Sequence, residues 1–282
     1  MKRATVQFAG GLGNQLFIYS FAVWLKENGQ NPVLNLNRID SSHNLSYYDF
    51  RNLINLDNSF DLVESKWYRF NAFWLSHVSD ALRSRHMVGN SLFFADFYQT
   101  FRYFDSLKNP FRLKDQSVSV VNTKEIANMI NQSGKCLIHV RLGDLLTSNG
   151  SWILNAEFYE KSISLLSDDS KPGGWVVTDS PKLMTRYLAG TTLENYKVLN
   201  ISSPIDCFYL ISQCERVVLS NSTFALWASK LTVLDKQKVV VPTHLNKNLP
   251  TKELDFPDSW DAYNSSWLNS NQIQELKGIK LH

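Results

Sequence analysis

The sequence has few cysteines and no pattern that would pair them or bind zinc. Cys136, Cys207 and Cys214 are widely spaced, and no C-x-x-C occurs. An odd and scattered set is typical of proteins in a reducing compartment. We therefore expect three buried thiols, without a disulfide framework or a zinc site.

Long apolar runs are also missing. The stretch Leu16–Leu25 is too short to span a bilayer, and no other segment is long enough. The chain reaches Gly10 before the apolar core of a signal peptide could fit. We expect a cytoplasmic protein with at most peripheral contact with the inner membrane.

Neither sign of charge dominates. The net charge is +3 with a pI near 8.6, and no basic run interleaved with aromatics is dense enough to predict nucleic-acid binding. This mild balance fits an anionic nucleotide as a ligand. With 44% hydrophobic and 20% charged residues, the 282-residue chain is typical of a globular protein of two domains.

Several catalytic motifs are absent as well. The sequence contains no P-loop, no D-x-D that would hold a metal at a sugar nucleotide, no H-E-x-x-H or H-x-x-E-H, and no G-x-S-x-G. These absences argue against P-loop nucleotide hydrolases, metal-dependent D-x-D transferases, zinc proteases and α/β-hydrolases.

The N-terminal residues predict a βαβ unit. A strand at Val6–Ala9 leads into a glycine turn, a helix over Asn14–Asn28 and a second strand at Pro32–Leu36. This order favours a parallel sheet. Residues 40–110 are irregular and aromatic, and two interpretations stay open for them: an acceptor groove or the core of the first domain. The aromatics concerned are Trp67, Tyr68, Phe70, Phe73, Trp74, Phe93, Phe94, Phe97 and Tyr98.

From Lys135 onward, strands and helices alternate. The predicted strands are 135–140, 174–178, 196–199, 216–220 and 238–242, and the predicted helices are 157–166, 181–188, 205–214 and 223–231. This pattern predicts a doubly wound α/β domain. We place the domains at 1–130 and 131–262, followed by a helical tail at 263–282.

Four unusual segments follow predicted strands. They are Gly10–Gln15, His139–Asp144, Thr178–Ser180 and Ser220–Phe224. Ligands of open parallel sheets bind at the carboxyl ends of the strands, so these segments predict a two-domain enzyme with a ligand between its domains. The glycine turn is not a dinucleotide fingerprint, because Leu16 stands where a glycine or alanine is needed.

The residue types in these segments suit an anion. His139 and Arg141 share one face of a strand, and the guanidinium fork of Arg141 matches phosphate oxygens. Asp144 either holds Arg141 or caps the next segment, and the alternative is a structural Arg–Asp pair beside a core histidine. At the glycine turn, Gly11 and Gly13 let the backbone approach a ligand closely, and Asn14 adds a neutral donor.

The other two segments carry hydroxyls and a carboxylate. Ser222 and Thr223, with first-turn N–H groups, predict a cradle for a pyrophosphate, although an ordinary N-cap by Ser222 is the alternative. Asp179 either accepts from a guanine edge or a ribose hydroxyl, or caps the helix that begins at Pro181.

Together these segments resemble glycosyltransferase family 11, the α-1,2-fucosyltransferases. The family motif G-G-L-G-N-Q is matched at residues 10–15, and H-x-R-x-G-D at residues 139–144. S-N-S-T-F is matched at residues 220–224, whereas S-D-D is matched only at Asp179. The agreement in order and spacing extends from residue 6 to about residue 245.

The resemblance implies a GT-B-type α/β fold, with two Rossmann-like domains of parallel sheets facing a central cleft. It also implies inverting transfer from GDP-fucose, without a cofactor or metal, to a galactose-terminated oligosaccharide or lipid-linked glycan in O-antigen or lipopolysaccharide synthesis. By position, Arg141 and His139 would contact the pyrophosphate, Asp179 the guanosine and Asn14 the sugar. The remaining donor-binding residues would be Gly11, Gly13, Ser220, Asn221, Ser222, Thr223 and Phe224.

The match is incomplete, and other functions remain open. Leu142, Leu145, Ser180 and Ala225–Leu226 depart from the family pattern. The proton acceptor is either Asp144 or the departing phosphate oxygen. The nearest alternative is another fucosyl linkage or another GDP-sugar. An NAD-dependent oxidoreductase fits less well, because no acidic residue ends the strand at Pro32–Leu36. A glycan-binding protein with a degenerate nucleotide site is the non-enzymatic alternative.

Overall fold

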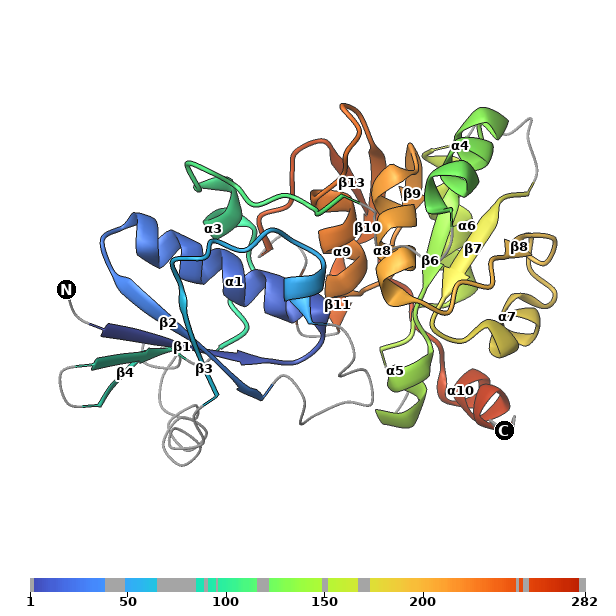
Figure 1. Ribbon diagram of the computed structural model, residues 1–282. Helices are drawn as coiled ribbons and strands as arrows, with labels where there is room; N and C mark the ends of the chain where they lie inside the picture. Colours follow the sequence, from blue (N-terminus) through green and yellow to red (C-terminus); the bar gives the residue numbers. More distant parts are fainter. Residues whose placement is uncertain are drawn as a thin grey trace. The chain divides into compact units, whose positions relative to one another are not determined.

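The computed structural model describes residues 3–38, 49–64, 85–88, 91–94, 96–115, 122–148, 152–166, 173–246, 249–250 and 254–278 (Figure 1). The chain forms two compact units, Met1–Asp115 (unit 1) and Gln116–His282 (unit 2). Each unit is built on a sheet of its own and is described by itself.

Unit 1 contains a five-stranded sheet with the order β3-β2-β1-β5-β4. Its strands are β1 (Arg3–Ala9), β2 (Asn31–Arg38), β3 (Asp61–Val63), β4 (Arg85–Val88) and β5 (Ser91–Phe94). All neighbours are parallel except the edge pair β4 and β5. Helix α1 (Leu12–Glu27) connects β1 to β2, which confirms the predicted βαβ unit (Figure 1).

Aromatic side chains fill the core of unit 1, around α1, the short helix η1 (Phe50–Asn52) and α3 (Arg102–Asp105). The ring of Tyr19 contacts those of Phe50, Phe60 and Phe111. Of the predicted aromatic region, Phe94 is buried and Tyr98 stacks on Phe21, so both serve the core. Phe97 is exposed, at 40%. The other side chains of that set, Trp67, Tyr68, Phe70, Phe73, Trp74 and Phe93, lie outside the described residues.

Unit 2 contains a six-stranded sheet with the order β13-β10-β9-β6-β7-β8, in which every neighbouring pair is parallel. The strands are β6 (Leu137–Val140), β7 (Trp175–Thr178), β8 (Lys197–Val198), β9 (Arg216–Val218), β10 (Lys238–Pro242) and β13 (Trp260–Tyr263). A small antiparallel pair, β11 (His244–Asn246) and β12 (Leu249–Pro250), follows β10. The helices are α4 (Thr123–Ser133), α5 (Gly143–Ser148), α6 (Ala156–Ser164), α7 (Pro181–Leu188), α8 (Pro204–Gln213), α9 (Thr223–Lys230) and α10 (Ser270–Lys277).

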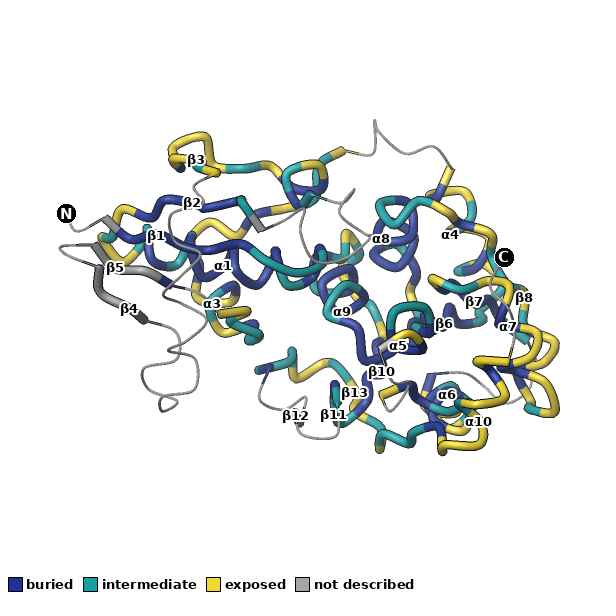
Figure 2. Tube along the Cα trace, turned by 90° about the horizontal axis from the view of Figure 1, so that it is seen from below, coloured by how far each residue is buried: buried dark blue, intermediate teal, exposed yellow. Residues whose placement is uncertain are grey.

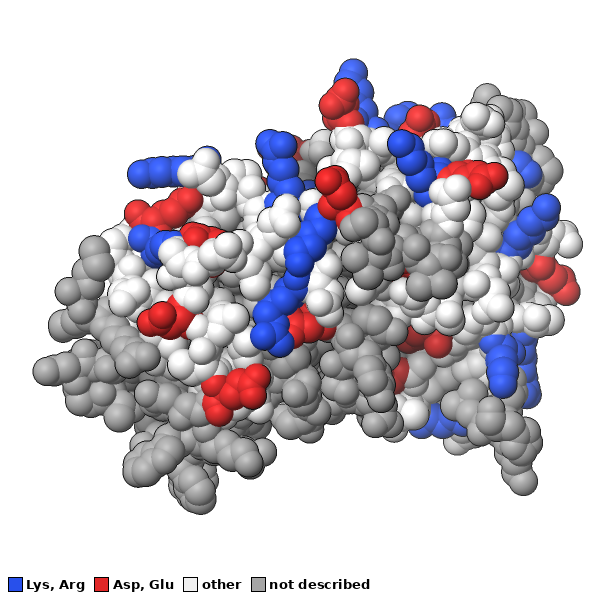
Figure 3. Space-filling view, viewed as in Figure 1, with Lys and Arg blue, Asp and Glu red and all other residues white. Residues whose placement is uncertain are grey.

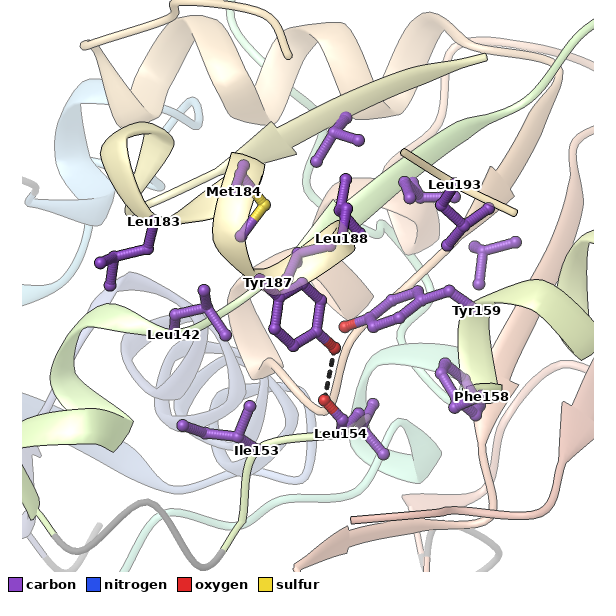
Figure 4. Close-up of a cluster of buried hydrophobic side chains, with 14 of the residues drawn as sticks. Leu142, Ile153, Leu154, Phe158, Tyr159, Leu183, Met184, Tyr187, Leu188 and Leu193 are labelled. Atoms are coloured by element: carbon purple, nitrogen blue, oxygen red, sulfur yellow. Dashed lines mark hydrogen bonds between the residues drawn. The ribbon is translucent and has the colours of Figure 1, made fainter. Parts of the chain in front are cut away.

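Helices cover both faces of the sheet of unit 2. Figure 2 shows α4 and α8 on one side of the strands and α6 and α10 on the other. Between the sheet and α6 and α7 lies a hydrophobic cluster, part of which is drawn in Figure 4. Within it, the Tyr187 hydroxyl donates a hydrogen bond of 2.5 Å to the carbonyl of Leu154. This three-layer arrangement is the predicted doubly wound domain.

The predicted fold class is therefore confirmed as a GT-B-type chain of two α/β units with largely parallel sheets. The cleft between the units stays a prediction. The units divide between Asp115 and Gln116, ahead of the boundary near residue 130, because the unpredicted helix α4 packs against α8 and belongs to unit 2. Helix α10 contacts α7, so the predicted tail is part of the same unit.

The distribution of surface charge and the state of the cysteines agree with what the composition predicts. On the face shown in Figure 3, basic and acidic side chains are interspersed. Cys136, Cys207 and Cys214 are free and buried, as expected, and burial raises the pKa of Cys136 to about 11 and that of Cys207 to about 12. Among the described residues, no helix combines the length and apolarity needed to cross a membrane.

Candidate functional site

The glycine turn of unit 1 joins β1 to α1 in a conformation that requires glycine at its first position. Gly10 has φ +77°, and an added Cβ would lie 2.9 Å from Asn14 Nδ2. Gly11, by contrast, has an ordinary extended backbone, and a Cβ there would meet nothing within 4 Å. Gly11 is the N-cap of α1 without a side-chain cap, so the first-turn N–H groups of the helix have no capping side chain.

The two amide side chains of the turn are held by hydrogen bonds within unit 1. Gln15 donates to the Gly10 carbonyl at 2.9 Å and accepts from the Phe50 N–H at 3.1 Å, so it fixes the turn against η1. Asn14 accepts from Gln99 Nε2 at 2.9 Å, which leaves its own N–H₂ group facing the Gly10 side. Sequence reasoning missed Gln99, because 85 residues separate it from Asn14.

In the sheet of unit 2, the order in which the chain adds strands reverses between β6 and β9. Strands β7 and β8 lie on one side of β6, while β9, β10 and β13 lie on the other. Ligands of open α/β sheets bind at such a switch point, outside the carboxyl ends of the strands. Three of the predicted segments follow β6, β7 and β9, so they meet at this edge of the sheet.

His139 and Ser220 connect the two strands of the switch point. His139 Nδ1 lies 2.8 Å from the Ser220 hydroxyl oxygen, and both residues are buried. Burial, with a smaller effect of Arg141, lowers the pKa of His139 to about 3, so the ring is neutral at neutral pH. The ring of Phe224 lies 6.1 Å from that of His139. The predicted histidine is therefore a neutral group that bonds β6 to the loop after β9.

Arg141 follows β6 and is held by Asp144, one of the two roles predicted for that carboxylate. Arg141 Nε donates to Asp144 Oδ1 at 3.0 Å, and Arg141 Nη2 donates to Asp144 Oδ2 at 2.5 Å. The side chains are 29% and 33% exposed, so the pair remains accessible. Two donors of the fork are used, and Nη1 has no hydrogen-bond partner within the described part of the chain.

Leu142 and Leu145, which depart from the family pattern, point into the core. Both are buried members of the hydrophobic cluster. A second guanidinium at position 142 would be buried among aliphatic side chains, where a charge is costly. The apolar residues at 142 and 145 thus anchor the loop and α5 to the core.

Asp179 follows β7 and binds the loop after β6. Its carboxylate accepts from the N–H groups of Leu142 at 2.9 Å and of Gly143 at 3.1 Å. The residue is exposed, yet the surrounding protein desolvates the carboxylate and raises its pKa, while the two N–H groups and Arg141 lower it. Ser180, and not Asp179, is the N-cap residue of α7.

The segment after β9 begins with three buried residues, Ser220, Asn221 and Ser222, and continues into the half-buried Thr223 and Phe224. Ser220 bonds His139, and Asn221 donates to the carbonyls of Trp152 and Leu245, so both hold the loop in place. Ser222 is the N-cap residue of α9, but its side chain makes no capping hydrogen bond. The hydroxyls of Ser222 and Thr223 and the first-turn N–H groups of α9 are the donors left at this end of the helix.

The structure thus brings together the predicted residues of unit 2 and separately arranges those of unit 1. At the edge of the unit 2 sheet lie His139, Arg141, Asp144, Asp179, Ser220, Asn221, Ser222, Thr223 and Phe224. In unit 1, Gly11 is the N-cap residue of α1, and Gly13 and Asn14 lie in the first turn of that helix. Among the residues that the structure describes, no three His, Cys, Asp or Glu side chains are placed to hold a metal ion. The donor set suits phosphate oxygens and hydroxyls.

The sequence profile of "Glycosyl transferase family 11" matches residues 66–267 of this chain. The chain belongs to glycosyl transferase family 11. It is a glycosyltransferase, and the match includes all the site residues of unit 2 but not the glycine turn of unit 1. The resemblance found in the motifs is thereby confirmed.

Two Escherichia coli proteins are similar to this family 11 chain. The "O-antigen biosynthesis glycosyltransferase WbnK" is 25% identical, and the alignment covers 83% of this chain and 92% of that protein. An "Alpha-1,2-colitosyltransferase" is 21% identical, with 95% and 99% covered. Both are similar to this chain over most of their own length.

Solved structures with a similar fold are more distant. The fucosyltransferase NodZ from Bradyrhizobium gives a TM-score of 0.46 at 12% identity, covering 82% of this chain and 92% of that one. A glycosyl transferase family 9 protein from Veillonella parvula gives 0.47 at 10% identity, covering 99% and 90%. At TM-scores below 0.5, these likenesses decide nothing about the reaction.

Proposed function

We propose that this family 11 protein is an inverting, metal-independent fucosyltransferase. It transfers L-fucose from GDP-β-L-fucose to O2 of a galactose-terminated glycan, in the synthesis of an O-antigen or lipopolysaccharide. The observation that carries the proposal is the accessible Arg141, held by Asp144 after β6, the strand that neighbours β9 at the switch point and so the uncapped start of α9 that follows β9. The name of the similar WbnK supports the O-antigen assignment.

The donor set suits a diphosphate. Arg141 keeps Nη1 for an anionic oxygen, and the hydroxyls of Ser222 and Thr223 with the N–H groups of α9 provide neutral donors. In the proposed complex these groups bind the two phosphates of GDP. His139 and Asn221 hold the loops that carry them.

In the reaction, the acceptor oxygen attacks C1 of fucose as the bond between C1 and the phosphate oxygen breaks. The sugar passes through an oxocarbenium-like state while negative charge grows on the departing GDP. A guanidinium fixed in advance stabilises that growing charge more than it stabilises the ground state, which lowers the barrier. Attack from the face opposite GDP inverts the anomeric centre.

The acceptor proton passes in this proposal to the departing phosphate. Both oxygens of Asp144 accept from Arg141, which makes Asp144 a poorer general base than an unpaired carboxylate would be. Its role in catalysis is then to orient the guanidinium. Asn14, whose amide is oriented by Gln99, binds a hydroxyl of the transferred sugar in the complete site.

The name of the second relative favours one alternative donor, GDP-activated colitose, transferred with the same α-1,2 linkage. The two donors are separated by measuring GDP release from each with lactose as acceptor and EDTA present. Release from GDP-fucose that depends on lactose supports the proposal, and NMR of the product identifies the linkage. Release only from GDP-colitose establishes the alternative, and glycan binding without any affinity for GDP establishes a non-enzymatic function.

A further inference from the structure

The carboxylate of Asp179 binds the backbone that links the two members of the Arg141–Asp144 pair. Its Oδ1 accepts from the N–H of Leu142 and its Oδ2 from the N–H of Gly143, at 2.9 and 3.1 Å. These are the only residues between Arg141 and Asp144 in the sequence. One side chain at the end of β7 therefore fixes two of the three peptide groups that link Arg141 to Asp144.

Close packing reinforces these hydrogen bonds. A Cβ added at Gly143 would lie 3.0 Å from Asp179 Oδ2 and 3.2 Å from the Ser180 hydroxyl oxygen. The strands that carry the two loops are neighbours in the sheet, with Val140 opposite Thr178. Leu142 is also buried in the cluster beneath the loop. The loop is thus held from below by an apolar side chain and from the side by a carboxylate.

Both oxygens of Asp179 are bonded to the loop. Each carboxylate oxygen already accepts a charge-assisted hydrogen bond from a backbone N–H group. Turning the carboxylate toward a ligand would break both bonds, and the part-buried N–H of Leu142 would lose its acceptor at a cost in free energy. A direct contact with the nucleoside, as the family resemblance implies, would use the remaining lone pairs of an oxygen that already holds the loop.

We propose that Asp179 is a positioning residue for Arg141. It holds the peptide groups of Leu142 and Gly143 so that the guanidinium, paired with Asp144, faces the diphosphate. Its effect on the donor is then exerted through the phosphates and not through the guanosine. The inference rests on the proposed function for the identity of the ligand, but the contacts that carry it do not depend on the ligand.

The first test measures binding of GDP and of guanosine to the full chain carrying Asp179→Asn. The asparagine retains the size of the side chain but can accept only one of the two N–H bonds. We expect the dissociation constant for GDP to rise about tenfold and that for guanosine to change less than twofold. Asp235→Asn is the matched control, because Asp235 is exposed in the turn before β10, and it should leave both constants unchanged.

A double-mutant cycle tests whether the effect passes through Arg141. In an Arg141→Ala background, Asp179→Asn should change the affinity for GDP less than twofold. A tenfold loss in both backgrounds would overturn the proposal, and so would a loss of guanosine affinity that matches the loss for GDP. Gly143→Ala, which pushes the carboxylate from the other side, should reproduce the Asp179→Asn phenotype.

Hydrogen exchange separates this proposal from the proposed function. In Asp179→Asn, the backbone N–H groups of Leu142 and Gly143 should exchange at least tenfold faster than in the wild type, with or without GDP. Unchanged exchange would show that the carboxylate does not hold the loop. If the wild type failed to bind GDP, the assignment of the donor would be wrong, while the exchange result would still decide the role of Asp179 in positioning the loop.

Discussion

The glycine turn of unit 1 and the strand ends of unit 2 carry different kinds of polar group. At the turn, Asn14 and Gln15 are neutral amides bonded within the unit. At the strand ends, Arg141, Asp144 and Asp179 form a charged network around a loop. Charged groups respond strongly to charge that develops on a ligand, whereas neutral amides mainly fix shape. Substitutions in unit 2 should therefore change reaction rates most, and those at the turn should first change stability.

The largest effect is expected from Arg141→Ala. Loss of the fixed guanidinium should lower kcat by about 10²- to 10³-fold, as for other groups that stabilise transition-state charge. Steady-state kinetics of GDP release measures the loss, and circular dichroism checks the fold. The matched control is Arg186→Ala, an exposed arginine on α7, which should retain wild-type turnover. A folded Arg141→Ala protein with normal kcat would remove Arg141 from the mechanism.

The next effect compares two adjacent glycines of the turn. Gly10→Ala places a side chain at φ +77°, with its Cβ 2.9 Å from Asn14 Nδ2. The free energy of local unfolding of α1 should therefore fall by about 2 kcal/mol. Gly11→Ala enters open space with an ordinary backbone conformation and should change it by less than about 0.5 kcal/mol. Hydrogen exchange of the α1 N–H groups measures both values. Equal destabilisation by the two variants would contradict the geometry, and a raised KM for Gly11→Ala alone would indicate close approach of a ligand.

A smaller effect is a pH dependence of stability, which the buried His139 of unit 2 should cause and the neutral amides of the turn should not. The pKa of His139 is about 3 in the folded chain and ordinarily 6.5, so protons favour the unfolded chain. The contribution of His139 to the free energy of unfolding should be constant above pH 6.5. It should fall as the pH decreases toward 3, by about 2 kcal/mol at pH 5. Urea denaturation of the wild type and of His139→Gln at pH 7 and 5 isolates this loss, which the variant should lack. Parallel pH profiles for the two proteins would refute the assignment.

The smallest effect is expected from Gln99→Ala. The amide of Asn14 would lose the donor that orients it, and one such hydrogen bond is worth about 1 kcal/mol. We expect kcat/KM to fall about fivefold, with little change in the affinity for GDP. Gln132→Ala, at an exposed position of α4, is the control. An unchanged kcat/KM would mean that the orientation of Asn14 does not matter for transfer.

Local patterns predicted the elements whose ends are marked by strong signals. Helix α7 runs from Pro181 to Leu188 and strand β10 from Lys238 to Pro242, as expected, because proline starts the first and a run of valines before a proline defines the second. The edge strands β3, β4 and β13 and the helices α4 and α5 were missed. The short strands and α5 become regular only through pairing and packing with distant segments. Helix α4 was missed although Asn122 caps its start and Gly134, in the left-handed region, ends it.

In the site, too, contacts between residues close in sequence were predicted and contacts between distant segments were not. The motifs identified Arg141 and Asp144, which are close in sequence and form the expected pair. They could not reveal that Asp179 binds the backbone of residues 142 and 143, because no sequence pattern marks a backbone donor. Nor could they reveal Gln99, which reaches Asn14 only once the two segments are folded together.

The buried thiols make this chain convenient for spectroscopic labelling. The ionised form of a thiol reacts with maleimides, and burial raises the pKa of all three native cysteines. A cysteine introduced at Leu62 in unit 1 or at Met129 in unit 2, positions exposed at 44% and 48%, should therefore be modified far faster than the native thiols. A pair of dyes at these positions would report the distance between the units during turnover, without removal of any natural residue from the core.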